Sequence, residues 1–128
     1  MNKRIISTAA IFGILAVVFG AFGAHALKAR ISPLELETWK TAVEYQFYHV
    51  FALLFLSSYS KDPNKFLNWS FWCFTVGIVL FCGSLYLIAT KNLFQIQQIS
   101  FLGPLTPVGG LFFISGWLFL LLSSLKNK

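Results

Sequence analysis

The polar side chains that could carry chemistry gather in one stretch of an otherwise apolar sequence, residues 39–49, which reads Trp-Lys-Thr-Ala-Val-Glu-Tyr-Gln-Phe-Tyr-His. The stretch holds a carboxyl group, an amide, an imidazole and two phenols, contributed by Glu44, Gln46, His49, Tyr45 and Tyr48. All five groups can form hydrogen bonds, and the carboxyl and imidazole groups can also exchange protons. The stretch therefore predicts either hydrogen bonds that join helices or a route for protons or small solutes.

No recognisable catalytic set accompanies these residues. The sequence has no Ser-His-Asp or Cys-His arrangement, no facing pair of carboxylates and no glycine-rich loop placed to hold phosphate. Cys73 and Cys82 point to opposite faces of one helix and cannot bridge each other, and no Cys/His spacing suits a metal. A haem held by His25 and His49 of one chain is not expected, because these residues differ in depth by roughly 15–20 Å. We therefore expect a protein that is not an enzyme and has no cofactor.

The composition is that of a membrane protein. The chain has 128 residues, of which 57% are hydrophobic, 18% aromatic and only 11% charged, with a mean hydropathy of +0.73. A soluble domain is far less apolar, so the lipid bilayer is the expected surrounding. The net charge of +6 comes from Lys and Arg between apolar runs and at the termini, not from a basic face with stacking aromatic residues. We expect no nucleic-acid binding.

Four apolar segments are each long enough to cross a hydrocarbon core of about 30 Å as a helix. They cover approximately residues 5–27, 38–59, 66–90 and 108–125. The predicted fold is therefore all-α: one integral membrane domain, residues 1–128, forming a bundle of four transmembrane helices.

Local signals place several helix ends. Ser32 and Glu35 form a capping box around Pro33, which predicts that the second helix begins there. Thr106 and Pro107 have the types of an N-cap and a first helical residue, so the last helix is expected to open there. Residues 92–105 are expected to form either a short interfacial helix or a continuation of the third helix. Trp39 is expected in the aromatic belt of the membrane interface.

Basic residues predict the orientation. With four spans, six Lys and Arg residues share a side with both termini and four lie on the other side. The six are Lys3, Arg4, Lys61, Lys65, Lys126 and Lys128, and the four are Lys28, Arg30, Lys40 and Lys91. The excess favours cytoplasmic termini.

Small residues recur at helical spacing and predict close contacts between helices. This packing seam comprises Gly13, Gly20, Gly23, Gly77, Gly83, Gly109, Gly110 and Gly116. In the first span it is also consistent with the lining of a ligand site.

The ionisable groups of the second span are expected to face the bundle interior, because a charged group at the bilayer centre costs about 2.5–3.5 kcal/mol. Counting residues along the helices places Ser84 level with Glu44, and Trp117 level with His49. The indole N–H of Trp117 needs an acceptor at that depth, and a neutral His49 nitrogen is one candidate. Tyr86 lies near Ser84 and completes the predicted polar cluster.

Several sequence blocks together resemble the YgdD-type family of small bacterial membrane proteins, relatives of animal transmembrane protein 256 that form a domain of unknown function. The blocks are Gly20-Ala-Phe-Gly-Ala-His-Ala-Leu27, Trp39-Lys-Thr-Ala-Val-Glu-Tyr-Gln46 with His49, Gly83-Ser-Leu-Tyr86, Leu102-Gly-Pro-Leu-Thr-Pro-Val-Gly-Gly110 and Gly116-Trp117. The resemblance implies four transmembrane helices in the bacterial plasma membrane and supplies no catalytic residue.

Three functions agree with these features. The first is a structural or interaction role in the membrane, with self-association through the glycine seam as one form of it. The second is a proton-linked transporter or channel that uses Glu44 and His49. The third is lipid binding by basic residues at the outer end, where His25, Lys28 and Arg30 lie together with Lys91.

Overall fold

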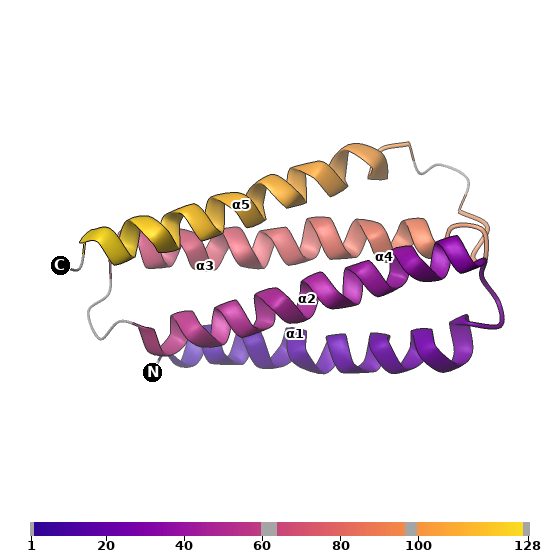
Figure 1. Ribbon diagram of the computed structural model, residues 1–128, viewed down its shortest axis with the longest axis horizontal. Coiled ribbons are helices and arrows are strands. Elements are labelled where there is room, and N and C mark those ends of the chain that lie inside the picture. Colours follow the sequence, from indigo (N-terminus) through magenta and orange to yellow (C-terminus); the bar gives the residue numbers. More distant parts are fainter. Residues whose placement is uncertain (1, 60–63, 97–99, 127–128) are drawn as a thin grey trace.

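The structure is a computed structural model and describes residues 2–59, 64–96 and 100–126. The helices of these residues form four long rods, which lie side by side (Figure 1). The first rod is α1 (Lys3–Phe22) with the π-helical turn η1 (Gly23–Leu27), and the second is α2 (Pro33–Tyr59). The third joins α3 (Lys65–Gly77), the π-helical η2 (Ile78–Cys82) and α4 (Gly83–Thr90), and the fourth is α5 (Leu102–Lys126).

Three of these rods are long and apolar enough to cross a membrane, Lys3–Leu27, Lys65–Thr90 and Leu102–Lys126. The remaining rod, α2, has 27 residues and the same reach, but it carries the polar stretch and is less apolar. The predicted fold class, an all-α membrane bundle of four helices, is confirmed. Both chain ends lie at the same end of the bundle (Figure 1).

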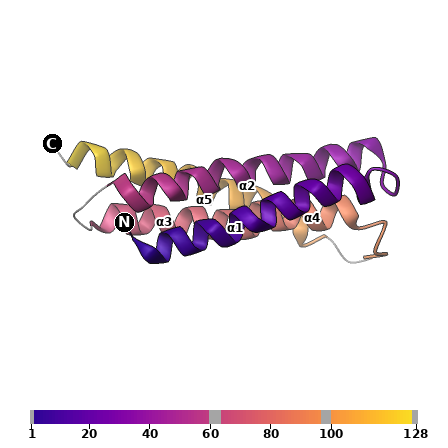
Figure 2. The ribbon, with the colours of Figure 1, turned by 90° about the horizontal axis from the view of Figure 1, so that it is seen from below.

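The helices differ in which neighbours they pack against. Helix α1 packs along α2, which in turn packs on η2 and α4, and α5 lies on α3 and η2. Figure 2 shows α1 running along the outside of the bundle. Side chains bridge α2 and α5, with the rings of Tyr45 and Phe81 4.8 Å apart and those of Phe81 and Phe113 5.3 Å apart. The aromatic residues thus fill the space between these two helices.

The capping box at the start of α2 is confirmed. The Glu35 backbone N–H donates to Ser32 Oγ over 3.1 Å, and the Ser32 backbone N–H donates to Glu35 Oε1 over 3.0 Å. The carboxylate also accepts a hydrogen bond of 3.2 Å from Asn92. Hydrogen bonds from the backbone and side chain of Ser32 are the main reason why the pKa of Glu35 lies below its usual range.

The predicted start of the last helix is wrong. Helix α5 begins at Leu102, and Pro107 lies inside it. Thr106 Oγ1 is not a cap, because it hydrogen-bonds to Ser84 Oγ of α4 at 2.6 Å. A proline this close to a helix end leaves only a carbonyl of the first turn without its usual donor, so the helix tolerates it.

Among the described residues of 92–105, neither expectation is correct. The third rod ends at Thr90, and a turn follows at once, in which the Ile96 N–H donates to the Lys91 carbonyl over 2.8 Å and Gln95 has a φ of 52°. Residues 102–105 already belong to α5. Gln97, Gln98 and Ile99 lie outside the described residues.

The glycine seam marks the closest approaches between helices. A Cβ atom would overlap the Trp39 indole at Gly23, the Phe113 ring at Gly77, the Phe81 backbone at Gly109 and the Phe74 ring at Gly116. Gly13, Gly20 and Gly110 have room for ordinary contacts, at 3.6, 3.5 and 3.9 Å. Gly83 is a correction, since nothing lies within 4 Å of its Cβ position.

Candidate functional site

His49 occupies the middle of the bundle and joins α2 to α5. The side chain is buried, with 4% of its surface exposed. Its Nδ1 lies 2.7 Å from the Tyr45 carbonyl, and its Nε2 accepts a hydrogen bond of 3.1 Å from the Trp117 indole N–H. A carbonyl only accepts, so Nδ1 carries the proton and the imidazole is neutral. The ring stacks on Phe113 with the centroids 3.6 Å apart.

Gln46 joins three helices. Its side chain is 2% exposed. Its amide nitrogen donates to the Phe12 carbonyl of α1 over 2.7 Å, and its amide oxygen accepts from the Tyr86 hydroxyl of α4 over 2.7 Å. Both polar ends of the amide are therefore bonded to neighbouring helices.

Trp39 does not face lipid but points into the bundle. The side chain is 6% exposed, lies against Gly23 and donates its indole N–H to the Phe19 carbonyl over 2.8 Å. Its ring is 4.6 Å from that of Tyr86. The absence of a side chain at Gly23 makes room for the indole, so Trp39 packs inward. Trp69 and Trp72, exposed by 43% and 49%, fit the aromatic belt.

Small hydroxyl residues join α5 to its neighbours. Ser70 of α3 is buried and donates to the Gly116 carbonyl over 2.8 Å. Ser84, which residue counting places level with Glu44, bonds instead to Thr106 of α5. Sequence reasoning missed Ser70 and Trp39. The available signal was the glycine opposite each of them, because a residue without a Cβ allows a polar side chain to reach the backbone.

Glu44 does not face the bundle interior, which corrects the central expectation for this stretch. Its side chain is exposed, as are those of Tyr45 and Tyr48, at 39% and 55%. At about 100° per residue, Gln46 and His49 lie on the face of α2 roughly opposite Glu44. The polar stretch thus covers two faces of α2, one with Gln46 and His49 inside and one with Glu44 and Tyr48 outside.

A shallow groove runs beside Glu44, between α1 and α2. Its α2 wall is formed by Lys40, Val43 and Glu44. Trp39 also lines the groove, and the first rod contributes Gly20 of α1 with Gly23 and Ala24 of η1. The small residues of α1 keep this groove open.

The basic residues predicted at the outer end lie on the surface of the bundle. His25, Lys28 and Arg30 are exposed, and Lys91 is half-buried. They do not converge on one described pocket.

The buried polar groups are fully paired. Among residues 2–59, 64–96 and 100–126, every buried side-chain nitrogen and oxygen atom has a hydrogen-bond partner. The same residues contain no group of three His, Cys, Asp or Glu side chains arranged to hold a metal ion. The interior arrangement is suited to holding helices together.

Comparison with known proteins gives one consistent result. A family model described as "Protein of unknown function (DUF423)" matches residues 19–110. UPF0382 membrane proteins of Staphylococcus haemolyticus and Staphylococcus aureus are each 40% identical over 124 residues, covering 97% of this chain and 97% of theirs. The UPF0382 membrane protein YwdK of Bacillus subtilis is 38% identical over 127 residues, with 97% and 98% covered.

No solved structure matches the chain significantly. The expected membership of a small membrane-protein family of unknown function is confirmed by the near full-length relatives. With the four-helix membrane fold and these matches together, the chain belongs to the DUF423 family of membrane proteins.

Proposed function

We propose that this protein is a structural or interaction component of the bacterial plasma membrane, and neither an enzyme nor a transporter. The observation that carries the proposal is that His49 and Gln46, two polar side chains in the interior of the bundle, are each fully hydrogen-bonded to other residues. Each has both of its polar atoms hydrogen-bonded, His49 once within α2 and once to α5, and Gln46 to α1 and α4. Neither has a polar atom left to relay a proton or bind a solute.

The interhelical hydrogen bonds are sufficient to fix the order of the helices. Five of them join different helices through Trp39, Gln46, Tyr86, Trp117 and Ser70. At about 0.6–1.7 kcal/mol for each bond inside a membrane, they contribute on the order of 3–8 kcal/mol together. Such a bundle offers a rigid platform in the membrane.

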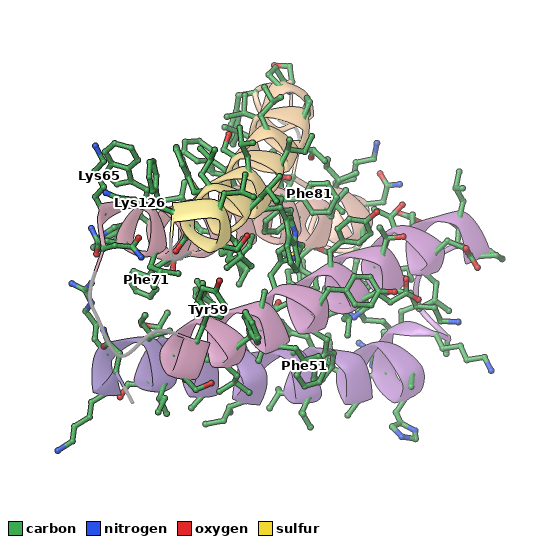
Figure 3. The ribbon with its side chains drawn as sticks, turned by 60° about the vertical axis from the view of Figure 1, so that its left-hand side comes forward. Phe51, Tyr59, Lys65, Phe71, Phe81 and Lys126 are labelled. Carbon is green, nitrogen blue, oxygen red and sulfur yellow. The ribbon has the colours of Figure 1, made fainter. Side chains whose placement is uncertain are left out.

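We further propose that both termini lie in the cytoplasm. The end of the bundle that holds the termini carries Lys3, Arg4, Lys65 and Lys126, and Figure 3 labels Lys65 and Lys126 at this end. Lys61 and Lys128, which also belong to the count, lie outside the described residues. Arg4 donates to Asn68 over 2.9 Å and lies 4.9 Å from the centre of the Phe71 ring. An excess of Lys and Arg next to the spans is typical of the cytoplasmic side, whereas aromatic residues mark both interfaces.

A flux assay tests the absence of transport. Purified protein in liposomes is subjected to a pH gradient, and the wild type is compared with Glu44→Gln, His49→Phe and empty liposomes. We expect the same proton flux in all four. Flux through the wild type that either substitution abolishes would overturn the proposal and favour a proton-linked transporter.

A labelling assay tests the orientation. Single cysteines at Lys3 and Lys28 lie at opposite ends of the bundle, in a background in which Cys73 and Cys82 are replaced by Ala. In intact cells a membrane-impermeant maleimide is expected to label the cysteine at position 28 and not that at position 3. The reverse pattern, or equal labelling, would contradict cytoplasmic termini.

A further inference from the structure

The exposed face of α2 carries two polar side chains, Glu44 and Tyr48, to which lipid chains can offer no hydrogen bond. Val43 of α2 lies level with Gly20 of α1, 3.5 Å from its Cβ position. The first rod runs seven residues further, to Leu27, which is about 10 Å of helix at 1.5 Å per residue. Glu44 therefore lies about two helical turns in from the end of the first rod, with Lys40 one turn nearer that end on the same groove. Lipid chains at that depth would supply the carboxyl group with no hydrogen-bond donor.

Within residues 2–59, 64–96 and 100–126, the Glu44 carboxyl and the Tyr48 hydroxyl form no hydrogen bond, whereas the nearby Gln46, His49 and Tyr86 side chains all do. Intramembrane carboxyl groups normally face protein rather than lipid. The face that carries Glu44 is therefore one that another molecule covers.

The spacing along this face fits a second α-helix. Exposed or half-exposed side chains recur at intervals of three and four residues, and the stripe consists of Glu37, Thr41, Glu44, Tyr48, Phe51 and Phe55. This heptad spacing is the pattern with which two parallel helices pack in a left-handed pair. Phe51, labelled in Figure 3, is 61% exposed.

The stripe is also complementary to itself. Copies of one chain insert into the membrane in the same orientation, so a twofold axis along the membrane normal brings equivalent residues to the same depth. A helical side chain leans toward the N-terminus of its helix, so the Tyr48 phenol reaches toward the level of Glu44, one turn away. The donor of one copy is therefore level with the acceptor of the other.

We propose that two copies of this chain associate through the exposed face of α2, where the Tyr48 hydroxyl of each copy donates to the Glu44 carboxyl of the other. The groove next to Glu44, between α1 and α2, receives the aromatic side chains of the second copy along its glycine-lined wall. This inference rests on the proposed structural role and names the partner as a second copy.

Cysteine crosslinking locates the interface. In a background in which Cys73 and Cys82 are replaced by Ala, Phe51→Cys is compared with Ile11→Cys, whose native residue is equally exposed, at 59% against 61%. Ile11 lies on α1, on its side away from α2. In proteoliposomes at a high lipid-to-protein ratio we expect several times more crosslinked dimer from Phe51→Cys. Equal yields, or no dimer from either, would overturn the proposal.

A second measurement keeps both native cysteines and so does not depend on that background. Full-length protein is labelled at its terminus with a donor or an acceptor fluorophore and placed in liposomes. The efficiency of resonance energy transfer then measures association as the protein is diluted with lipid. Tyr48→Phe removes two symmetric hydrogen bonds and is expected to weaken association about eightfold. Tyr45→Phe, the control on the neighbouring position, is expected to stay within about twofold. An unchanged dimer in Tyr48→Phe, or an equal loss in both variants, would overturn the proposal.

The two proposals fail separately. Proton flux through the reconstituted protein would remove the structural role whatever its oligomeric state. Absence of the Phe51 crosslink would remove the dimer and leave the role of the interior hydrogen bonds untouched.

Discussion

Removal of the Tyr86 hydroxyl tests whether buried hydrogen bonds hold this bundle together. In the native protein that hydroxyl donates to the Gln46 amide oxygen over 2.7 Å. Tyr86→Phe keeps the ring and its contacts with Phe19 and Trp39, at 4.9 and 4.6 Å. The substitution therefore leaves one buried acceptor without a donor and changes little else.

The expected magnitude follows from the burial of Gln46, which is 2% exposed. A buried acceptor left without its donor destabilises a soluble protein by about 1–3 kcal/mol. Hydrogen bonds measured inside membrane proteins lie lower, at about 0.6–1.7 kcal/mol. We therefore expect Tyr86→Phe to lower the free energy of unfolding by about 1–2 kcal/mol. Gln46→Leu, which also removes the bond to the Phe12 carbonyl, is expected to have at least the same effect.

A double-mutant cycle isolates the bond. The free energy of unfolding is measured by titrating the protein in mixed micelles with a denaturing detergent and following the helical circular dichroism. Once Gln46→Leu is present, Tyr86→Phe is expected to have little further effect, which gives a coupling energy of about 1 kcal/mol. Strictly additive effects, within about 0.3–0.5 kcal/mol, would refute the reasoning.

Three other predictions concern separate parts of the molecule. Trp117→Phe is expected to lower the free energy of unfolding by about 1 kcal/mol in the same titration, because His49 Nε2 loses its donor; an unchanged value would contradict this. Gly109→Ala is expected to destabilise the protein by about 1–3 kcal/mol, because its Cβ would overlap the Phe81 backbone. Gly83→Ala, whose Cβ meets open space, is expected to stabilise the protein by up to about 1 kcal/mol. Equal effects of the two substitutions would show that the helices do not pack this closely. Because the pKa of Glu35 is lowered in the folded protein, its cap stabilises the start of α2 at pH values above the pKa of Glu35 in the unfolded chain. This stabilisation is lost as the pH falls through the lowered pKa. Amide hydrogen exchange at residues 34–37 is therefore expected to become faster in acid in the wild type and to depend far less on pH in Glu35→Gln.

Much of the architecture followed from the sequence, because it depends on length and local pattern. Four apolar runs long enough to span a bilayer have few alternatives to helices, since lipid supplies no partner for an open backbone. The capping box at Ser32 and Glu35 acts within four residues, so it could be recognised without the fold. The pairing of Trp117 with His49 was predictable because both lie at one depth and the indole needs an acceptor.

Other features could not be predicted from local pattern. Thr106 does not cap the last helix, which begins at Leu102, and its hydroxyl bonds instead to Ser84 on another helix, a contact between residues far apart in the sequence. Trp39 turns inward because Gly23 of the neighbouring helix leaves room for its indole. Both outcomes depend on which helix face meets which neighbour.

The sequence alone determined that this protein is a helical membrane bundle with a polar second helix, because hydropathy, length and helix caps act along the chain. The tertiary structure decided which side of that helix is inside. Gln46 and His49 face α1, α4 and α5, whereas Glu44 and Tyr48 point outward. The physical reason is that the helices packed on α2, α1 on one flank and η2 with α4 on the other, meet the sides that carry Gln46 and His49. The face that carries Glu44 and Tyr48 stays exposed within a single chain.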